Sequence, residues 1–231
     1  EQAQVLLKQS IEREPNNPIH YYHLGLALEL STFYPEALNA FQLSLDFLGT
    51  LPDIPAELLD YVLPFGYNRF AVEWERASFQ NWTDLQERWN HYQCLLQWNI
   101  YQRMGLIYTQ SQQLEEAKTS YLKALELNLP FGETDYYLAQ LLNTKGEPRE
   151  AIHYYRSAFQ KQPYLIQGWL ELVSLLLEEG LFQETLDFVN DCLLLLQINN
   201  ELPKIKEQMS ELKFLATLFL DNDSAESILS A

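Results

Sequence analysis

Residues 98–131 read WNIYQRMGLIYTQSQQLEEAKTSYLKALELNLPF. The first half of this stretch places large apolar residues three and four positions apart around Gly105, which is the spacing of one face of an α-helix. The second half has the same spacing, with Tyr121 between the small residues Ala117 and Ala124. Small residues allow two helices to cross closely, and a bulky residue opposite them fills the remaining gap. The stretch therefore predicts a hairpin of two amphipathic helices.

The pattern of the second half recurs along the chain. Within each continuous run its positions step by 34 residues, and the step from Ala37 to Ala117 is 80, or two periods plus 12. Such self-similarity is typical of a repeat protein in which each unit stacks on the next. The recurring triplets, each small, large, small, are Ala3/Leu7/Ser10, Ala37/Phe41/Ser44, Ala117/Tyr121/Ala124, Ala151/Tyr155/Ala158 and Thr185/Val189/Cys192.

The period fixes the expected organisation of the chain. We expect an all-α fold with an irregular centre, because 12 extra residues interrupt the register and the next unit has Thr83, Glu87 and Asn90 in place of the triplet. The expected segments are a half repeat at 1–14, full repeats at 18–51, 98–131, 132–165 and 166–199, an insertion at 52–63, a degenerate repeat at 64–97, a C-terminal capping helix at 203–220 and an acidic, frayed tail at 221–231.

These patterns resemble the tetratricopeptide repeat, with Leu24-Gly25 in a first helix and Ala37, Phe41 and the small Ser44 in a second. The resemblance implies a right-handed superhelical solenoid of antiparallel helix pairs whose concave groove is lined by the first helices. It also implies a non-catalytic protein–protein interaction module that binds a protein or peptide in this groove. The residues expected there are Tyr22, His23, Leu26, Asn68, Arg69, Asn99, Gln102, Arg103, Tyr136, Tyr137, Gln140 and Asn143.

Two arginines suggest what a partner carries. Arg69 and Arg103 lie 34 residues apart, at equivalent positions of adjacent predicted repeats. Two guanidinium groups in one groove favour a partner with an acidic anchor. The alternative is that Arg69 pairs with Glu73 on its own helix, and Arg103 with a carboxylate of a flanking repeat.

Aromatic residues crowd the irregular centre, which contains Trp74, Trp82, Trp89 and Trp98. Exposed rings at this density would stack on a sugar or anchor an apolar side chain of a partner. The alternative is that they fill a joint where the helix spacing is irregular.

Composition excludes several classes of function. Fifteen Lys and Arg against 32 Asp and Glu give a net charge of −17, which disfavours binding to nucleic acid or to an anionic membrane. Cys94 and Cys192 lie too far apart in the sequence for a zinc motif, and the absence of a disulfide framework favours a cytoplasmic location. We find no catalytic or nucleotide-binding motif, so no enzyme activity, cofactor or metal is expected.

The start of the chain at Glu1, inside a repeat, indicates a segment of a longer protein. One alternative function is therefore a substrate-recruiting arm of a larger enzyme, such as a glycosyltransferase or methyltransferase. An uncapped helix at 1–14 also allows a homodimer through that end.

Overall fold

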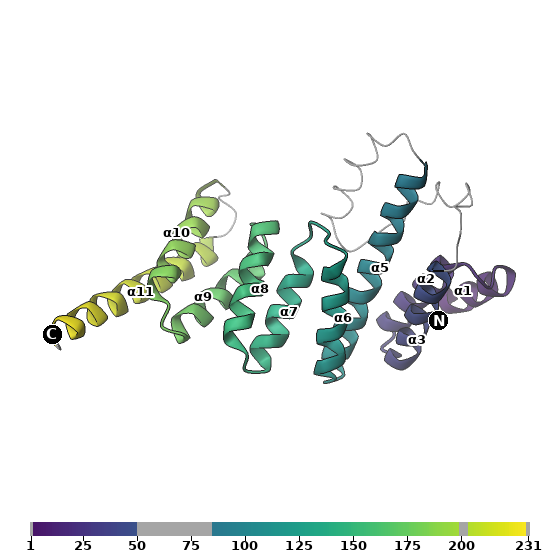
Figure 1. Ribbon diagram of the computed structural model, residues 1–231, viewed down its shortest axis with the longest axis horizontal. Coiled ribbons are helices and arrows are strands. Elements are labelled where there is room, and N and C mark those ends of the chain that lie inside the picture. The colour runs from purple at the N-terminus through teal and green to yellow at the C-terminus, as the bar shows by residue number, and fades with distance from the viewer. Residues whose placement is uncertain (1, 50–84, 199–202, 230–231) are drawn as a thin grey trace. The chain divides into compact units, whose positions relative to one another are not determined.

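Figure 1 shows the computed structural model, which describes residues 2–49, 85–198 and 203–229. Every regular element in these ranges is helical, which confirms the all-α prediction. The chain divides into two compact units, residues 1–137 and 138–231, and each is described by itself.

The first unit contains two helix pairs and a leading helix. Its last helix, α7, begins in this unit and continues into the second. The elements are α1 (Gln2–Arg13), α2 (Pro18–Leu30), α3 (Tyr34–Leu48), α5 (Leu85–Gln110), α6 (Leu114–Glu126) and the start of α7 (Glu133–Thr144).

The second unit begins at Leu138, within α7. The remaining elements are α8 (Pro148–Lys161), a 3₁₀ turn (Ile166–Gly168), α9 (Trp169–Glu178), α10 (Phe182–Ile198) and α11 (Pro203–Leu229). Pro148 starts α8, where a missing backbone N–H removes no helical hydrogen bond.

Glycine residues allow the helices of the pairs α2/α3 and α5/α6 to cross closely. A Cβ atom added to Gly25 on α2 would lie 2.6 Å from Cδ1 of Phe41 on α3. A Cβ atom added to Gly105 on α5 would lie 2.4 Å from Cε1 of Tyr121 on α6. Both distances are far below van der Waals contact, so only glycine fits beneath these rings.

The triplets of the second helices lie in the core, as their pattern predicts. In the four triplets that begin at Ala37, Ala117, Ala151 and Thr185, every member is buried and at most 2% exposed. The buried hydroxyl of Ser44 has a hydrogen-bond partner, because it donates a 2.7 Å hydrogen bond to the carbonyl of Pro18 at the start of α2. Each triplet therefore fixes a second helix in the core.

The leading helix α1 differs from the other second helices. It has no buried residue, and Ala3 at the first triplet position is exposed. Gln4 nevertheless joins α1 to the end of α2, because its Nε2 donates to the carbonyl of Ala27 at 3.3 Å and to Oγ of Ser31 at 3.1 Å.

Each described turn between a first and a second helix contains one residue with positive φ. Gly146 (φ 77°) and Gly180 (φ 72°) occupy this position in the second unit, as the sequence predicts for turn glycines. The equivalent positions in the first unit are occupied by Thr32 (φ 62°) and Gln112 (φ 61°), which adopt the left-handed region at a cost that glycine does not have.

The centre of the chain differs from the predicted arrangement. Helix α5 runs without a break from Leu85 to Gln110, across the predicted boundary between repeats 64–97 and 98–131. No Pro or Gly stands between Leu85 and Met104, so nothing in the sequence ends the helix there. The rest of the degenerate repeat and the insertion at 52–63 lie outside the described residues.

Direct contacts also join repeats that were expected to be separated. Helix α3 packs against α5, and a single apolar core extends from Phe41 on α3 through Leu96 and Ile100 on α5 to Ala124 on α6. Repeats 18–51 and 98–131 therefore share one apolar core, to which Leu96 of the predicted repeat 64–97 also belongs.

The closing helix is longer than predicted. It was expected to end at residue 220, but α11 continues to Leu229, into the predicted tail. The tail contains neither Pro nor Gly, so its composition permits the helix to continue.

Gly105→Ala is expected to lower the free energy of unfolding by about 1–2 kcal/mol, because the added methyl group collides with the ring of Tyr121. Urea denaturation followed by circular dichroism measures the change. Gly49→Ala is the matched control: Gly49 has φ −70° and its nearest neighbour in that direction is a carbonyl oxygen 3.7 Å away, so alanine there should not destabilise. Equal effects of the two substitutions would contradict the close crossing.

Gln112→Gly is expected to raise the free energy of unfolding by about 0.5–1 kcal/mol, since glycine adopts positive φ without steric cost. Gln113→Gly, at a neighbouring residue with φ −93°, should lower it instead. The same denaturation experiment tests both, and a loss of stability in Gln112→Gly would show that the turn is not strained.

Candidate functional site

The predicted groove residues lie on first helices wherever the structure describes them. Asn68 and Arg69 are outside the described residues. In the first unit the set comprises Tyr22, His23 and Leu26 on α2, Asn99, Gln102 and Arg103 on α5, and Tyr136 and Tyr137 on α7; in the second unit it comprises Gln140 and Asn143 on α7.

Some of these residues are buried and join the helices to one another. The hydroxyl of Tyr22 donates a 2.9 Å hydrogen bond to Oδ1 of Asn99, and the two residues are only 2% and 7% exposed. Tyr22 also packs its ring against Phe41, at 6.1 Å between centroids. This contact fixes α2 against α5 from inside the unit, so neither side chain is open to a partner.

Thr134 forms a second buried connection, between α5 and α7. Its hydroxyl oxygen accepts hydrogen bonds from Nε1 of Trp98 at 2.9 Å and from Nε2 of Gln102 at 3.2 Å. Trp98 is buried, with its ring centroid 4.7 Å from that of Phe131. For Trp98 the structure supports the interpretation that central aromatic residues fill the core. Trp74, Trp82 and the side chain of Trp89 are outside the described residues.

Four predicted residues of the first unit keep part of their surface accessible: His23, Leu26, Arg103 and Tyr137. We call these four side chains the first-helix face. Tyr136, next to Tyr137, is buried and packs against it at 5.5 Å between ring centroids.

Arg103 is at the centre of this face and forms an ion pair with Glu29 of α2. Its Nη1 lies 3.1 Å from Oε1 of Glu29, and the two side chains are 21% and 15% exposed. Burial raises the pKa of Glu29, and the nearby guanidinium group opposes this shift. Arg103 thus pairs with a carboxylate of another repeat, as the alternative interpretation of this residue expected, and that carboxylate belongs to Glu29.

The other accessible groups are uncharged at neutral pH. Burial, with a smaller contribution from His20, lowers the pKa of His23, so its imidazole is neutral. Burial raises the pKa of Tyr137, whose ring stacks on Tyr121 at 6.2 Å between centroids. The first-helix face therefore combines a balanced ion pair with an imidazole, a phenol and an aliphatic side chain, which suits hydrogen bonding and apolar contact.

In the second unit Gln140 belongs to a polar cluster around Glu171. Its Nε2 lies 3.0 Å and 3.1 Å from the two carboxylate oxygens of Glu171, and the hydroxyl of Tyr155 donates to Oε2 of Glu171 at 2.7 Å. Asn143 is exposed. Glu171 was not in the predicted set, although its sixth position in repeat 166–199, equivalent to Arg103 in its own repeat, could have identified it.

Three features of the described residues concern other kinds of function: metal binding, thiol reactivity and membrane crossing. No group of three or more His, Cys, Asp or Glu residues in the described part of the chain could hold a metal ion. Burial raises the pKa of Cys192 to about 12, so its thiol is protonated at neutral pH. Among the described helices, none is long and apolar enough to cross a membrane.

Comparison with known proteins identifies the fold. A family model described as a tetratricopeptide repeat matches residues 99–130, which contain Gly105 and the Ala117/Tyr121/Ala124 triplet. This segment of the chain is a tetratricopeptide repeat. No curated protein sequence matches it.

Solved structures, among them two of tetratricopeptide-repeat proteins, share the fold over most of the chain. YrrB is 15% identical, with a TM-score of 0.53 over 94% of this chain and 97% of YrrB. Residues 41 to the end of MamA from Desulfovibrio magneticus RS-1 are 14% identical, with a TM-score of 0.57 over 87% of each chain. The tetratricopeptide-repeat domain of P58(IPK) is 18% identical, with a TM-score of 0.51 over 98% of this chain and 62% of that domain. These similarities confirm the predicted solenoid fold class.

The ion pair predicts non-additive effects on stability. Arg103→Met should lower the free energy of unfolding by about 1–3 kcal/mol, because it leaves the Glu29 carboxylate largely buried without its cation. Combining it with Glu29→Gln should recover about 1 kcal/mol or more, since no charge is then left behind. Urea denaturation of the wild type, both single variants and the double variant gives the coupling energy. Additive effects would show that the pair contributes nothing.

Proposed function

We propose that this tetratricopeptide-repeat protein is a non-catalytic interaction module that binds a segment of a partner protein along the first-helix face. The observation that carries the proposal is the position of accessible imidazole, guanidinium, phenol and aliphatic side chains on the described first helices α2, α5 and α7. These groups offer hydrogen bonds and apolar contact at fixed positions, because buried contacts on the same helices hold the backbone in place.

A similar protein supports this proposal. YrrB, which shares the fold, is described as a tetratricopeptide-repeat protein with an unusual peptide-binding site. A shared fold does not show that two proteins bind the same ligand, so the argument for this chain rests on its own accessible side chains.

We also propose that a partner's acidic side chain competes with Glu29 for Arg103. An internal carboxylate already lies within hydrogen-bond distance of the guanidinium group, so the position accepts this chemistry. Exchange of one carboxylate for another would preserve the charge balance around Arg103. The Glu29 carboxylate would then be an intramolecular competitor that the acidic side chain of the partner must displace.

Site-specific photocrosslinking tests the proposed face. Replacement of Leu26 or Tyr137, which are half-buried on α2 and α7, with p-benzoylphenylalanine should give discrete protein adducts on irradiation in native cell extract. The matched controls carry the same group at Asn39 or Thr119, exposed positions of the second helices α3 and α6. Adducts from the second-helix positions alone would contradict the proposal.

The role of Arg103 is tested on the partner so identified. Arg103→Ala should weaken its binding about 10-fold or more if an acidic side chain uses the guanidinium group. Glu29→Gln should strengthen binding, because it removes the competing charge. If binding is unchanged in both variants, the face binds without an acidic anchor.

A further inference from the structure

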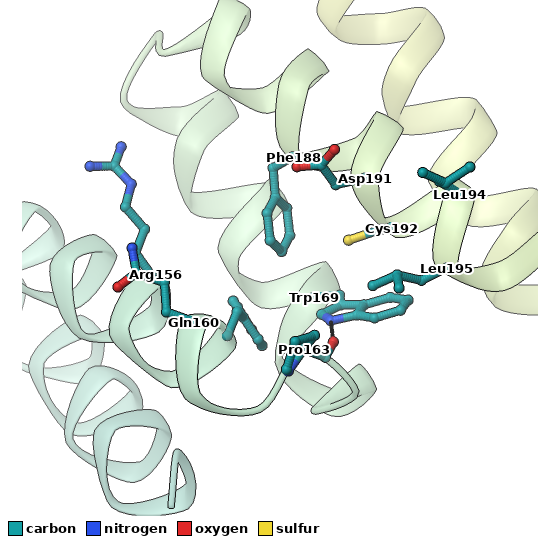
Figure 2. A pocket seen from close by; sticks show the side chains of 10 residues that line it. Arg156, Gln160, Pro163, Trp169, Phe188, Asp191, Cys192, Leu194 and Leu195 are labelled. Carbon is teal, nitrogen blue, oxygen red and sulfur yellow. Dashed lines mark hydrogen bonds between the residues drawn. The ribbon is translucent and has the colours of Figure 1, made fainter. Parts of the chain in front are cut away.

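A pocket in the second unit lies on helices other than those of the first-helix face. Its volume is about 460 Å³, and its apolar lining includes Phe159 on α8, Trp169 on α9, and Phe188, Leu194 and Leu195 on α10. Figure 2 shows Phe188 and Cys192 of α10 directed toward the space that Trp169 closes from below. Volumes of this size accommodate one or more large side chains of a partner.

Most of the pocket lining is apolar, although Gln160 also lines it. The indole N–H of Trp169 donates a 3.1 Å hydrogen bond to the carbonyl of Pro163, so this polar group is satisfied within the chain. Phe159 and Phe188 pack together at 5.3 Å between ring centroids. The Cys192 thiol is buried and uncharged at neutral pH. An apolar side chain would therefore enter without leaving a polar group unsatisfied.

The apolar surface extends beyond the pocket onto its rim. Leu194 is 60% exposed, although its neighbours Cys192 and Leu196 are buried. A small molecule that filled the pocket would leave this side chain in water, whereas a peptide segment lying across α10 would cover it. Exposed apolar surface beside a pocket is typical of a protein interaction site.

The charge on the rim specifies the partner further. Arg156, the cation that lines the pocket, forms an ion pair with Glu184, so its charge is balanced. Asp191 on the opposite rim is exposed, and no ion pair to it is found among the described residues. Asp187, one turn earlier on α10, is also exposed and accepts a hydrogen bond from Gln183. The uncompensated charge at the rim is therefore negative, which favours a basic group in the partner.

We infer that this pocket is a second protein-docking site, which binds a segment with an aromatic or branched aliphatic anchor and a Lys or Arg about one helical turn away. The anchor enters between α8 and α10, the basic side chain meets Asp191, and the backbone of the segment covers Leu194. This site is independent of the first-helix face, because its lining residues belong to α8, α9 and α10 and to the turn before α9.

Selection from a random library of 12-residue peptides displayed on phage, against the immobilised full chain, tests the inference. Enriched peptides should share the anchor and the nearby basic residue. Synthetic peptides should bind at least 10-fold more weakly to Leu194→Asp, which is expected to fold because Leu194 is exposed. Leu218→Asp, at another exposed leucine outside the pocket, is the matched control and should bind like the wild type.

Two further variants separate the components of recognition. Asp191→Asn should lower the affinity for the basic peptides about 3-fold, as expected for an exposed charge pair. Glu178→Gln, at an exposed glutamate outside the pocket, should leave this affinity unchanged. The indole N–H resonance of Trp169 should shift on peptide addition in the wild type. Arg103→Ala should leave binding unchanged, which distinguishes this site from the first-helix face.

The inference is overturned if the enriched peptides bind Leu194→Asp as tightly as the wild type, if they are acidic, or if no peptide is enriched. It is also overturned if sedimentation shows a dimer that Leu194→Asp dissociates, since a second copy of the chain would then occupy the pocket.

Discussion

The close crossing of a first helix over an aromatic side chain of its second helix is the constraint on which the complete repeats of the first unit depend. Gly25 and Gly105 leave room for the rings of Phe41 and Tyr121, which fill the space that a side chain would otherwise take. Around this contact the small residues of the second helix allow close approach, and the whole triplet is removed from water. Because the crossing fixes which side of each helix is buried, it also determines which side chains remain accessible.

Direct contact between α2 and α5 joins separate helix pairs into one first-helix face. The Tyr22–Asn99 hydrogen bond holds these helices together in the core, and the Glu29–Arg103 ion pair joins them nearer the surface. His23, Leu26 and Arg103 can therefore act together, although residues 52–97 separate their repeats in the sequence. Arg103 is consequently part of an ion pair with Glu29, and the proposed acidic side chain of a partner would have to compete with that carboxylate.

The sequence predicted features that depend on local spacing and missed those that depend on which helices meet. The helical class, the buried triplets and the turn glycines followed from periodicity, because each requires only that small and large residues recur on one face. The ion-pair partner of Arg103 could not be predicted from periodicity. Glu29 lies 74 residues away and becomes a neighbour of Arg103 only through the contact of α2 with α5. The burial of Tyr22 and Asn99 and the pocket on α8 and α10 likewise depend on three-dimensional packing, which repeat phase does not encode.

The most direct test of this account is a nuclear Overhauser measurement between the ring protons of Tyr22 and the side-chain amide protons of Asn99 in isotopically labelled protein. The hydroxyl of Tyr22 lies 2.9 Å from Oδ1 of Asn99, so the account predicts clear cross-peaks between the two side chains. Their absence, with cross-peaks from Tyr22 only to α2 and α3, would show that repeats 18–51 and 98–131 are not neighbours and that the proposed first-helix face does not exist.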